Sequence, residues 1–133
     1  TSRAIYFANM LGLDMGMFYK RRDYTKIVNG RNPIVAHEFL GSSVEGKDVL
    51  IVEDIVDSGI TLKYLMSYLS SKGASSVEIV TLLNKSARRA VNVSVKYVGF
   101  EAPDGFLVGY GLDYAEKYRN LPFIGILKEE IYS

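Results

Sequence analysis

The fold is decided by the stretch VLIVEDIVDSGITL, residues 49–62. Its first four residues are apolar and suit a strand that is covered on both faces, as in a parallel sheet. Glu53 and Asp54 follow at the expected carboxyl end of this strand, where open α/β sheets bind ligands. Residues 57–61, DSGIT, add a carboxylate, hydroxyls and a glycine where a helix begins and where backbone N–H groups can surround a phosphate. Acids for hydroxyls and amides for phosphate together indicate a sugar-phosphate site.

The other expected elements fit an α/β fold with a mainly parallel sheet flanked by helices. The apolar positions Leu62, Leu65, Met66 and Leu69 share one face of an amphipathic helix that Gly73 would end. Strands before and after this helix form a strand–helix–strand unit, which is expected to be parallel and right-handed. Helices are predicted at residues 3–11 and 61–72, strands at 15–19, 49–52, 77–83, 95–100, 106–110 and 123–127, and a long loop or weak β-excursion at 24–47.

Length and composition point to one domain over residues 1–133 and exclude several classes of function. A chain of 133 residues with 48% hydrophobic residues can bury one compact core. The net charge of +1 provides no general attraction for nucleic acids or anionic membranes. Without cysteine and with a single histidine, the sequence offers no disulfide framework, thiolate nucleophile or zinc cluster. No apolar run reaches the roughly 20 residues that span a bilayer, and a cytoplasmic location is expected.

Residues 49–62 resemble the phosphoribosyl pyrophosphate (PRPP) binding motif of the type I phosphoribosyltransferases, which have a Rossmann-like fold. The resemblance implies that Glu53 and Asp54 contact the ribose hydroxyls and that Asp57 lies beside the base as a proton donor or acceptor. It also implies that the 5'-phosphate is wrapped by Asp57, Ser58, Gly59, Ile60 and Thr61. The alternative is a strand with two solvated acids at its end and an ordinary helix cap.

Residues 49–132 also resemble hypoxanthine-guanine phosphoribosyltransferases. The resemblance lies in LNKSAR (83–88), VGFEAPD (98–104), FLVGYGLDY (106–114) and YRNL (118–121). It implies that Lys85 donates a hydrogen bond to the 6-oxo group of a purine, which would favour oxopurines over adenine because an ammonium group cannot accept. Phe106 would stack on the base, and Leu107 would offer backbone groups to its edge. The alternative for Phe106 is an ordinary core residue in a short strand.

The same resemblance implies a cation and a pyrophosphate site. Mg²⁺ would be the cofactor, held by Glu53, Asp54 and Asp113, because it prefers carboxylate, water and phosphate oxygens. Asp113 would also lie beside the purine, although it could instead cap the turn that follows. Arg119 would contact pyrophosphate, since a guanidinium group suits phosphate geometry.

Residues 1–52 resemble a different family, the ribose-phosphate pyrophosphokinases, in SRAIYFAN (2–9), YKRRDY (19–24) and VNGRNPIVAHEFLG (28–41). Both families share the type I phosphoribosyltransferase fold, so the two parts could build one sheet, and the resemblance suggests a chimera joined near residues 49–53. Residues 1–47 lack the small pyrophosphate loop and the Ser-Tyr hood expected of a purine transferase. Lys20, Arg21 and Arg22 could bind phosphate or form a solvated turn, and His37 could face a nucleotide or be structural.

These observations leave three functional hypotheses. The first is binding of PRPP or a ribonucleoside 5'-phosphate with Mg²⁺, with hypoxanthine or guanine phosphoribosyl transfer as the nominal, impaired reaction. The second is a pyrophosphokinase relative or fragment. The third is a non-catalytic hybrid scaffold that keeps the 5'-phosphate pocket. A homodimer is expected, with small molecules rather than nucleic acid or membrane as partners.

Overall fold

The computed structural model describes residues 2–28, 30, 34–103, 105–110, 112, 115 and 117–132. The chain forms two compact units, residues 1–45 and residues 46–133, and each is described by itself. No helix within these described ranges is long and apolar enough to cross a membrane.

In its described residues, the first unit contains one helix and one antiparallel strand pair. Helix α1, Ser2–Leu11, agrees with the predicted helix and is followed by Gly12 at a φ of 67°, a conformation that favours glycine after a helix. Strands β1, Met17–Arg22, and β2, Ile34–Leu40, pair with Phe18 opposite Phe39, whose rings lie 5.2 Å apart. Of the two alternatives for residues 24–47, the β-excursion is therefore correct for Ile34–Leu40.

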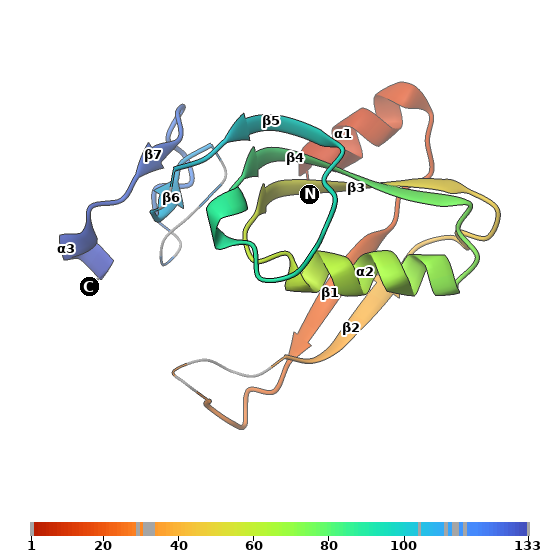
Figure 1. Ribbon diagram of the computed structural model, residues 1–133, viewed down its shortest axis with the longest axis horizontal. Coiled ribbons are helices and arrows are strands. Elements are labelled where there is room, and N and C mark those ends of the chain that lie inside the picture. The colour runs from red at the N-terminus through yellow and green to blue at the C-terminus, as the bar shows by residue number, and fades with distance from the viewer. Residues whose placement is uncertain are drawn as a thin grey trace. The chain divides into compact units, whose positions relative to one another are not determined.

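The second unit is an α/β layer followed by a small strand pair (Figure 1). Three parallel strands lie side by side in the order β3, β4 and β5, and helix α2 runs along one face of β3 and β4. Two short strands, β6 and β7, pair antiparallel after this layer. The bounds are β3 Asp48–Val56, α2 Ile60–Ser71, β4 Ser76–Asn84, the 3₁₀ turn η1 Ser86–Arg88, β5 Tyr97–Glu101, β6 Leu107–Val108, β7 Gly125–Ile126 and α3 Glu129–Tyr132.

The core of this unit lies between α2 and the sheet. Leu62, Leu65 and Leu69 are the buried face of α2, as their spacing predicts, and Leu69 is fully enclosed. Ile51, Ile79 and Leu83 cover them from β3 and β4. The helix ends at Ser71 and is followed by Gly73 at a φ of 92°, which agrees with the predicted glycine stop.

The structure corrects one detail of the predicted strand. β3 does not end at Val52 but continues to Val56, so Glu53 and Asp54 lie within the strand rather than after it. The extension follows from pairing, because β4 runs on to Asn84 and its backbone groups find partners up to Val56. The ligand-binding end of the sheet is therefore marked by residues 57–59, the loop between β3 and α2.

Candidate functional site

A pocket of about 390 Å³ lies in the second unit, at the carboxyl ends of β3 and β4. Asp54 and Asp57 reach it from the end of β3, and Lys85 follows the last residue of β4 directly. This edge of a parallel sheet is where α/β folds bind ligands. The pocket is lined by Asp54, Ile55, Asp57, Lys85, Phe106, Leu107 and Leu112.

The pocket brings together residues that the sequence singled out in two separate segments. Asp54 and Asp57 belong to the stretch 49–62, while Lys85, Phe106 and Leu107 lie 28 to 53 positions further along the chain. Their meeting in one concave site is the kind of arrangement that ligand pockets show, with a few polar groups set among apolar walls.

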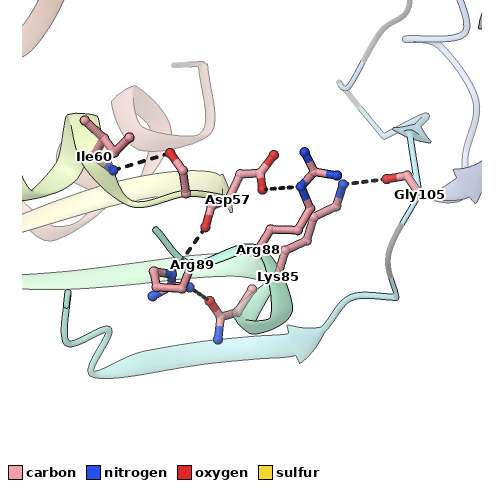
Figure 2. Close-up of polar contacts among 8 residues, drawn as sticks. Asp57, Ile60, Lys85, Arg88, Arg89 and Gly105 are labelled. Atoms are coloured by element: carbon pink, nitrogen blue, oxygen red, sulfur yellow. Dashed lines mark hydrogen bonds and ion pairs between the residues drawn. The ribbon is translucent and has the colours of Figure 1, made fainter. Parts of the chain in front are cut away.

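Lys85 is a buried cation with a defined position. Only 7% of it is exposed, and its Nζ donates a hydrogen bond of 2.5 Å to the carbonyl oxygen of Gly105 (Figure 2). Its backbone N–H also donates to Val56 O at 2.9 Å. A buried ammonium group needs polar partners, and Nζ has two further donors that Gly105 does not use. Lys85 can therefore hold a carbonyl-type acceptor in the pocket.

Phe106 and Leu107 contribute to the pocket in different ways. Leu107 is 8% exposed and pairs with Ile126 in the β6–β7 ladder, so its side chain belongs to the core. Phe106 is 40% exposed and lines the pocket, while its carbonyl accepts from Leu127 N at 2.7 Å. A ring that is fixed through its backbone but keeps an open face can stack against a flat ligand.

The loop before α2 does not resemble an ordinary capped helix start. Gly59 occupies the N-cap with a φ of 82° and has no side chain to offer. The Ile60 N–H lies 3.5 Å from Ser58 Oγ, at the long limit of a hydrogen bond (Figure 2). Asp57 does not cap the helix; its carboxylate instead pairs with Arg88 Nε at 3.1 Å. A conventional helix cap therefore does not account for this loop. The backbone N–H groups at this helix N-terminus have only a weak side-chain partner, so they can bind an anion.

Other predicted residues are not part of the pocket lining. Glu53 is half-buried and lies beside Thr81 in the register of β3 and β4. Because successive residues of a strand point to opposite faces, Glu53 faces the other side of the sheet from Asp54. Arg119 is exposed and lies outside the pocket lining. Asp113, the side chains of residues 20–22 and the side chain of His37 lie outside the described residues.

The donor set fits Mg²⁺ only with oxygens supplied by a substrate. Within the described residues, no three His, Cys, Asp or Glu side chains are grouped to hold a metal ion. Two carboxylates, Asp54 and Asp57, do line the pocket. Mg²⁺ commonly takes one or two carboxylates together with phosphate oxygens and water, so the pocket suits a metal that arrives with a diphosphate.

The sequence did not predict the polar network behind the pocket. Asn84 Nδ2 donates to Glu101 Oε1 at 2.6 Å, and Asn84 Oδ1 accepts a hydrogen bond from Arg89 Nη2. Arg89 Nε also donates to Asp57 O at 3.2 Å. The only signal in the sequence was the basic turn 85–89, in which the two arginines could not be distinguished from solvated residues.

Comparison with known proteins decides the family. A family model described as phosphoribosyl transferase domain matches residues 3–115. The chain belongs to this family. The fold is therefore the predicted type I phosphoribosyltransferase fold, built here on the parallel sheet β3–β4–β5.

Curated relatives of this phosphoribosyl transferase domain are purine enzymes. Hypoxanthine-guanine phosphoribosyltransferase of Bacillus subtilis is 57% identical over 93 residues, which are 70% of this chain and 52% of the relative. The same enzyme of Staphylococcus aureus strain Mu50 is 60% identical over 94 residues, again 52% of its length. The bifunctional protein TilS/HprT of Listeria monocytogenes is 62% identical over 94 residues, 71% of this chain and 14% of that protein. The chain thus spans about half the length of the single-function relatives.

Solved structures similar to this chain are also phosphoribosyltransferases. A crystal structure of a hypoxanthine phosphoribosyltransferase from Staphylococcus aureus has a TM-score of 0.74 and 44% identity, covering 100% of this chain and 74% of that one. The Trypanosoma cruzi enzyme in complex with the product IMP has a TM-score of 0.66 and 41% identity, covering 77% and 53%. The relatives and structures named here are phosphoribosyltransferases, so they give no support to a pyrophosphokinase origin for residues 1–52 or to a chimera. That part of the prediction remains without an observation in its favour.

Proposed function

We propose that this chain performs purine phosphoribosyl transfer, in which hypoxanthine or guanine receives the phosphoribosyl group of PRPP. The observation that carries the proposal is the single pocket in which Asp54 and Asp57 of the PRPP motif meet Lys85 and Phe106. The motif alone accounts for a sugar phosphate. The lysine and the open aromatic ring add what a flat oxopurine requires.

The base would lie on Phe106 with its 6-oxo group toward Lys85. The ring offers an open face, and the ammonium group donates without being able to accept. In adenine, an exocyclic amine replaces the 6-oxo group, so its N–H donors would face the N–H donors of the Lys85 ammonium group and no hydrogen bond would form. Leu107 supports this proposal through its backbone, since its side chain is buried in the β6–β7 pair. The pocket therefore favours hypoxanthine and guanine over adenine.

The 5'-phosphate would bind at residues 57–61. Ser58 and Thr61 supply hydroxyl groups, and Gly59 and Ile60 supply backbone N–H groups at the start of a 12-residue helix. The partial positive charge of that helix end favours an anion. Asp54 would accept hydrogen bonds from the ribose hydroxyls, with Glu53 proposed as a second acceptor from the same strand.

Mg²⁺ and pyrophosphate would occupy the outer part of the site. Asp54 and Asp113 are proposed to hold the cation together with diphosphate oxygens, whereas Glu53, expected from the sequence as a third ligand, points to the other face of β3. When bound, Mg²⁺ neutralises charge on the diphosphate. Arg119 is proposed to add a guanidinium fork to the same group.

In the reaction, a ring nitrogen of the purine forms a bond to C1' of the ribose while the bond from C1' to the pyrophosphate oxygen breaks. Phe106, Lys85 and the loop 57–61 would hold the two reactants in line, which can account for much of the rate enhancement. Asp57 would accept the proton that the purine ring loses, acting as a general base. Its position in the pocket and its exposed carboxylate support that role.

The test is incubation of the chain with PRPP, Mg²⁺ and either hypoxanthine or guanine, with IMP or GMP measured as product. Product that disappears in Asp57→Asn supports the proposal. Absence of product at high protein concentration, with GMP still bound in calorimetry, identifies a non-catalytic scaffold instead. Formation of PRPP from ATP and ribose 5-phosphate in a parallel reaction would favour the pyrophosphokinase alternative.

We further propose that the chain works as a cytoplasmic homodimer. Support for self-association comes from helix α1, where Phe7 is 58% exposed and Met10 and Leu11 are each 68% exposed. Clustered exposed apolar side chains often mark an association surface. Light scattering at several protein concentrations measures the assembly state directly.

A further inference from the structure

The loop between β3 and α2 is held from one side by a single later segment of the chain. Val56 O accepts from Lys85 N at 2.9 Å, Asp57 O from Arg89 Nε at 3.2 Å, and Ser58 O from Ala90 N at 2.9 Å. Three consecutive carbonyl groups thus point toward residues 85–90. Two of these bonds come from the backbone, and only the middle one depends on a side chain.

This pattern sets the direction of the loop's N–H groups. In a planar trans peptide, the C=O of one residue and the N–H of the next point in opposite directions. Because Asp57 O and Ser58 O are turned toward residues 85–90, the N–H groups of Ser58 and Gly59 are turned away from them. Successive N–H groups turned to the same side can bind an anion.

The Arg89 side chain is also held by residues outside the loop. Its Nη2 donates to Asn84 Oδ1, and its Nη1 lies 3.4 Å from Val93 O. Asn84 is only 8% exposed and is oriented in turn by Glu101, to which its Nδ2 donates at 2.6 Å. Because the guanidinium group is planar, the bonds of Nη1 and Nη2 also fix the position of Nε. At this position Nε donates its hydrogen bond to Asp57 O (Figure 2).

The stem of Arg89 also supports the loop sterically. A Cβ added at Gly59 would lie 3.0 Å from Arg89 Cδ and 3.3 Å from Val93 Cγ2. The Cα of Gly59 therefore packs against the aliphatic part of the Arg89 side chain. Its φ of 82° lets the backbone turn at the start of α2. The Arg89 side chain thus both donates a hydrogen bond to the loop and packs against it.

We infer that Arg89 is a positioning residue for the loop 57–59, holding the Asp57 carbonyl so that the following N–H groups stay in place for a phosphate. The inference rests on the proposed function for its ligand, since it is the 5'-phosphate that these N–H groups would receive. Arg89 itself touches the loop and not the reacting atoms. Its loss should therefore loosen the loop and weaken phosphate binding without disturbing the base site.

The experiment compares Arg89→Met, which keeps an apolar stem and removes the guanidinium, with Lys96→Met. Lys96 is an exposed cation paired with Glu78 at 2.8 Å and serves as the matched control. In ligand-free protein, backbone ¹⁵N order parameters of Ser58 and Gly59 should fall from about 0.85 to below about 0.6 in Arg89→Met only. In calorimetry, the Kd for GMP should rise roughly tenfold, while that for guanosine, which lacks the phosphate, stays within about twofold.

The two measurements separate this inference from the proposed function. Order parameters that stay near the wild-type values in Arg89→Met would overturn the inference, as would equal weakening of GMP and guanosine. A wild-type chain that fails to bind GMP would refute the proposed function, and the order parameters would still decide the role of Arg89. If circular dichroism shows that Arg89→Met does not fold, Arg89→Lys decides by the same two measurements, because lysine keeps stem and charge but cannot reproduce the planar fork.

Discussion

Asp57 is held at both of its ends by adjacent arginines. Arg88 Nε lies 3.1 Å from the carboxylate, and Arg89 Nε lies 3.2 Å from the carbonyl. The contact of Arg88 with the carboxylate is the weaker of the two, because the Arg88 and Asp57 side chains are 56% and 49% exposed. The Arg89 guanidinium is held more firmly, since it also bonds to Asn84 and Val93. Exposed ion pairs contribute little to stability, typically about 0–1 kcal/mol. The carboxylate can therefore exchange Arg88 for a ligand.

Asp57→Asn should lower kcat without removing nucleotide binding. The amide has nearly the size of the carboxylate but cannot accept a proton, and loss of a general base typically costs about 100-fold or more in rate. GMP affinity should change by less than about threefold, because the bound product needs no proton transfer. Steady-state rates and calorimetry on the same preparation measure both quantities. Arg88→Met is the control that keeps the carboxylate and removes its partner; a full rate in Asp57→Asn would exclude the base role.

Lys85→Gln should change which base is preferred. The lysine is 7% exposed and can only donate, while a glutamine amide can donate and accept. We expect GMP to bind about 10-fold more weakly and the preference for GMP over AMP to shrink by a similar factor, since a good polar match is worth about 1–3 kcal/mol. Ribose 5-phosphate, which has no base, should bind as before. Calorimetric titrations with the three ligands test this, and an unchanged ratio of GMP to AMP affinity would argue against Lys85 as the base-reading group.

At the scale of elements, the strand pair β6–β7 presents Phe106 and Leu107 to the pocket, although each strand has only two residues. Its stability depends on Gly109, whose φ is 95° and where an added Cβ would lie 2.0 Å from the carbonyl oxygen of Phe123. No side chain can be placed there without moving one of the two backbones. Gly109 is thus a structural requirement of the pocket wall that Phe106 and Leu107 form.

Gly109→Ala should therefore destabilise the protein and weaken base binding. Gly46→Ala is the matched control, because Gly46 also has a positive φ of 72° but nothing lies within 4 Å of its added Cβ. The control should cost about 1 kcal/mol from backbone strain alone, and Gly109→Ala should cost at least about 2 kcal/mol more. Urea unfolding gives both values, and GMP titration should show weakening only for Gly109→Ala. Equal costs for the two variants would show that β6 moves aside freely.

The same elements show what the sequence could and could not predict. The α2 helix and the strands β3 and β4 were predictable because their signals are local: leucines at helical spacing and continuous apolar runs. Strand β2 was left between two alternatives, because residues 24–47 contain turn residues such as those of NGRNP (29–33) but few periodic apolar positions that would mark a strand. The PRPP motif was found because its residues are contiguous. The bond from Arg89 to Asp57 spans 32 positions and depends on the path of the chain, which no local pattern encodes.

At the scale of the whole chain, all residues that line the pocket lie between positions 54 and 112, within the second unit. Nothing in the described lining comes from residues 1–45. Binding of a purine nucleotide should then depend on that unit alone, whereas association of two chains can use other surfaces. Helix α1, with Phe7 and Met10 more than half exposed, is one apolar candidate for such a surface in the first unit.

GMP affinity should therefore be independent of assembly state. A double variant, Phe7→Ser with Met10→Ser, removes two exposed apolar side chains from α1 and should shift light-scattering masses toward the monomer at a given concentration. Its Kd for GMP should match that of the wild type within about twofold, because no residue of α1 is in the described pocket lining. Calorimetry below and above the concentration at which the wild type associates provides the second comparison. An affinity that rises with association would mean that assembly and nucleotide binding are coupled, and the nucleotide site would then depend on the assembly rather than on one chain.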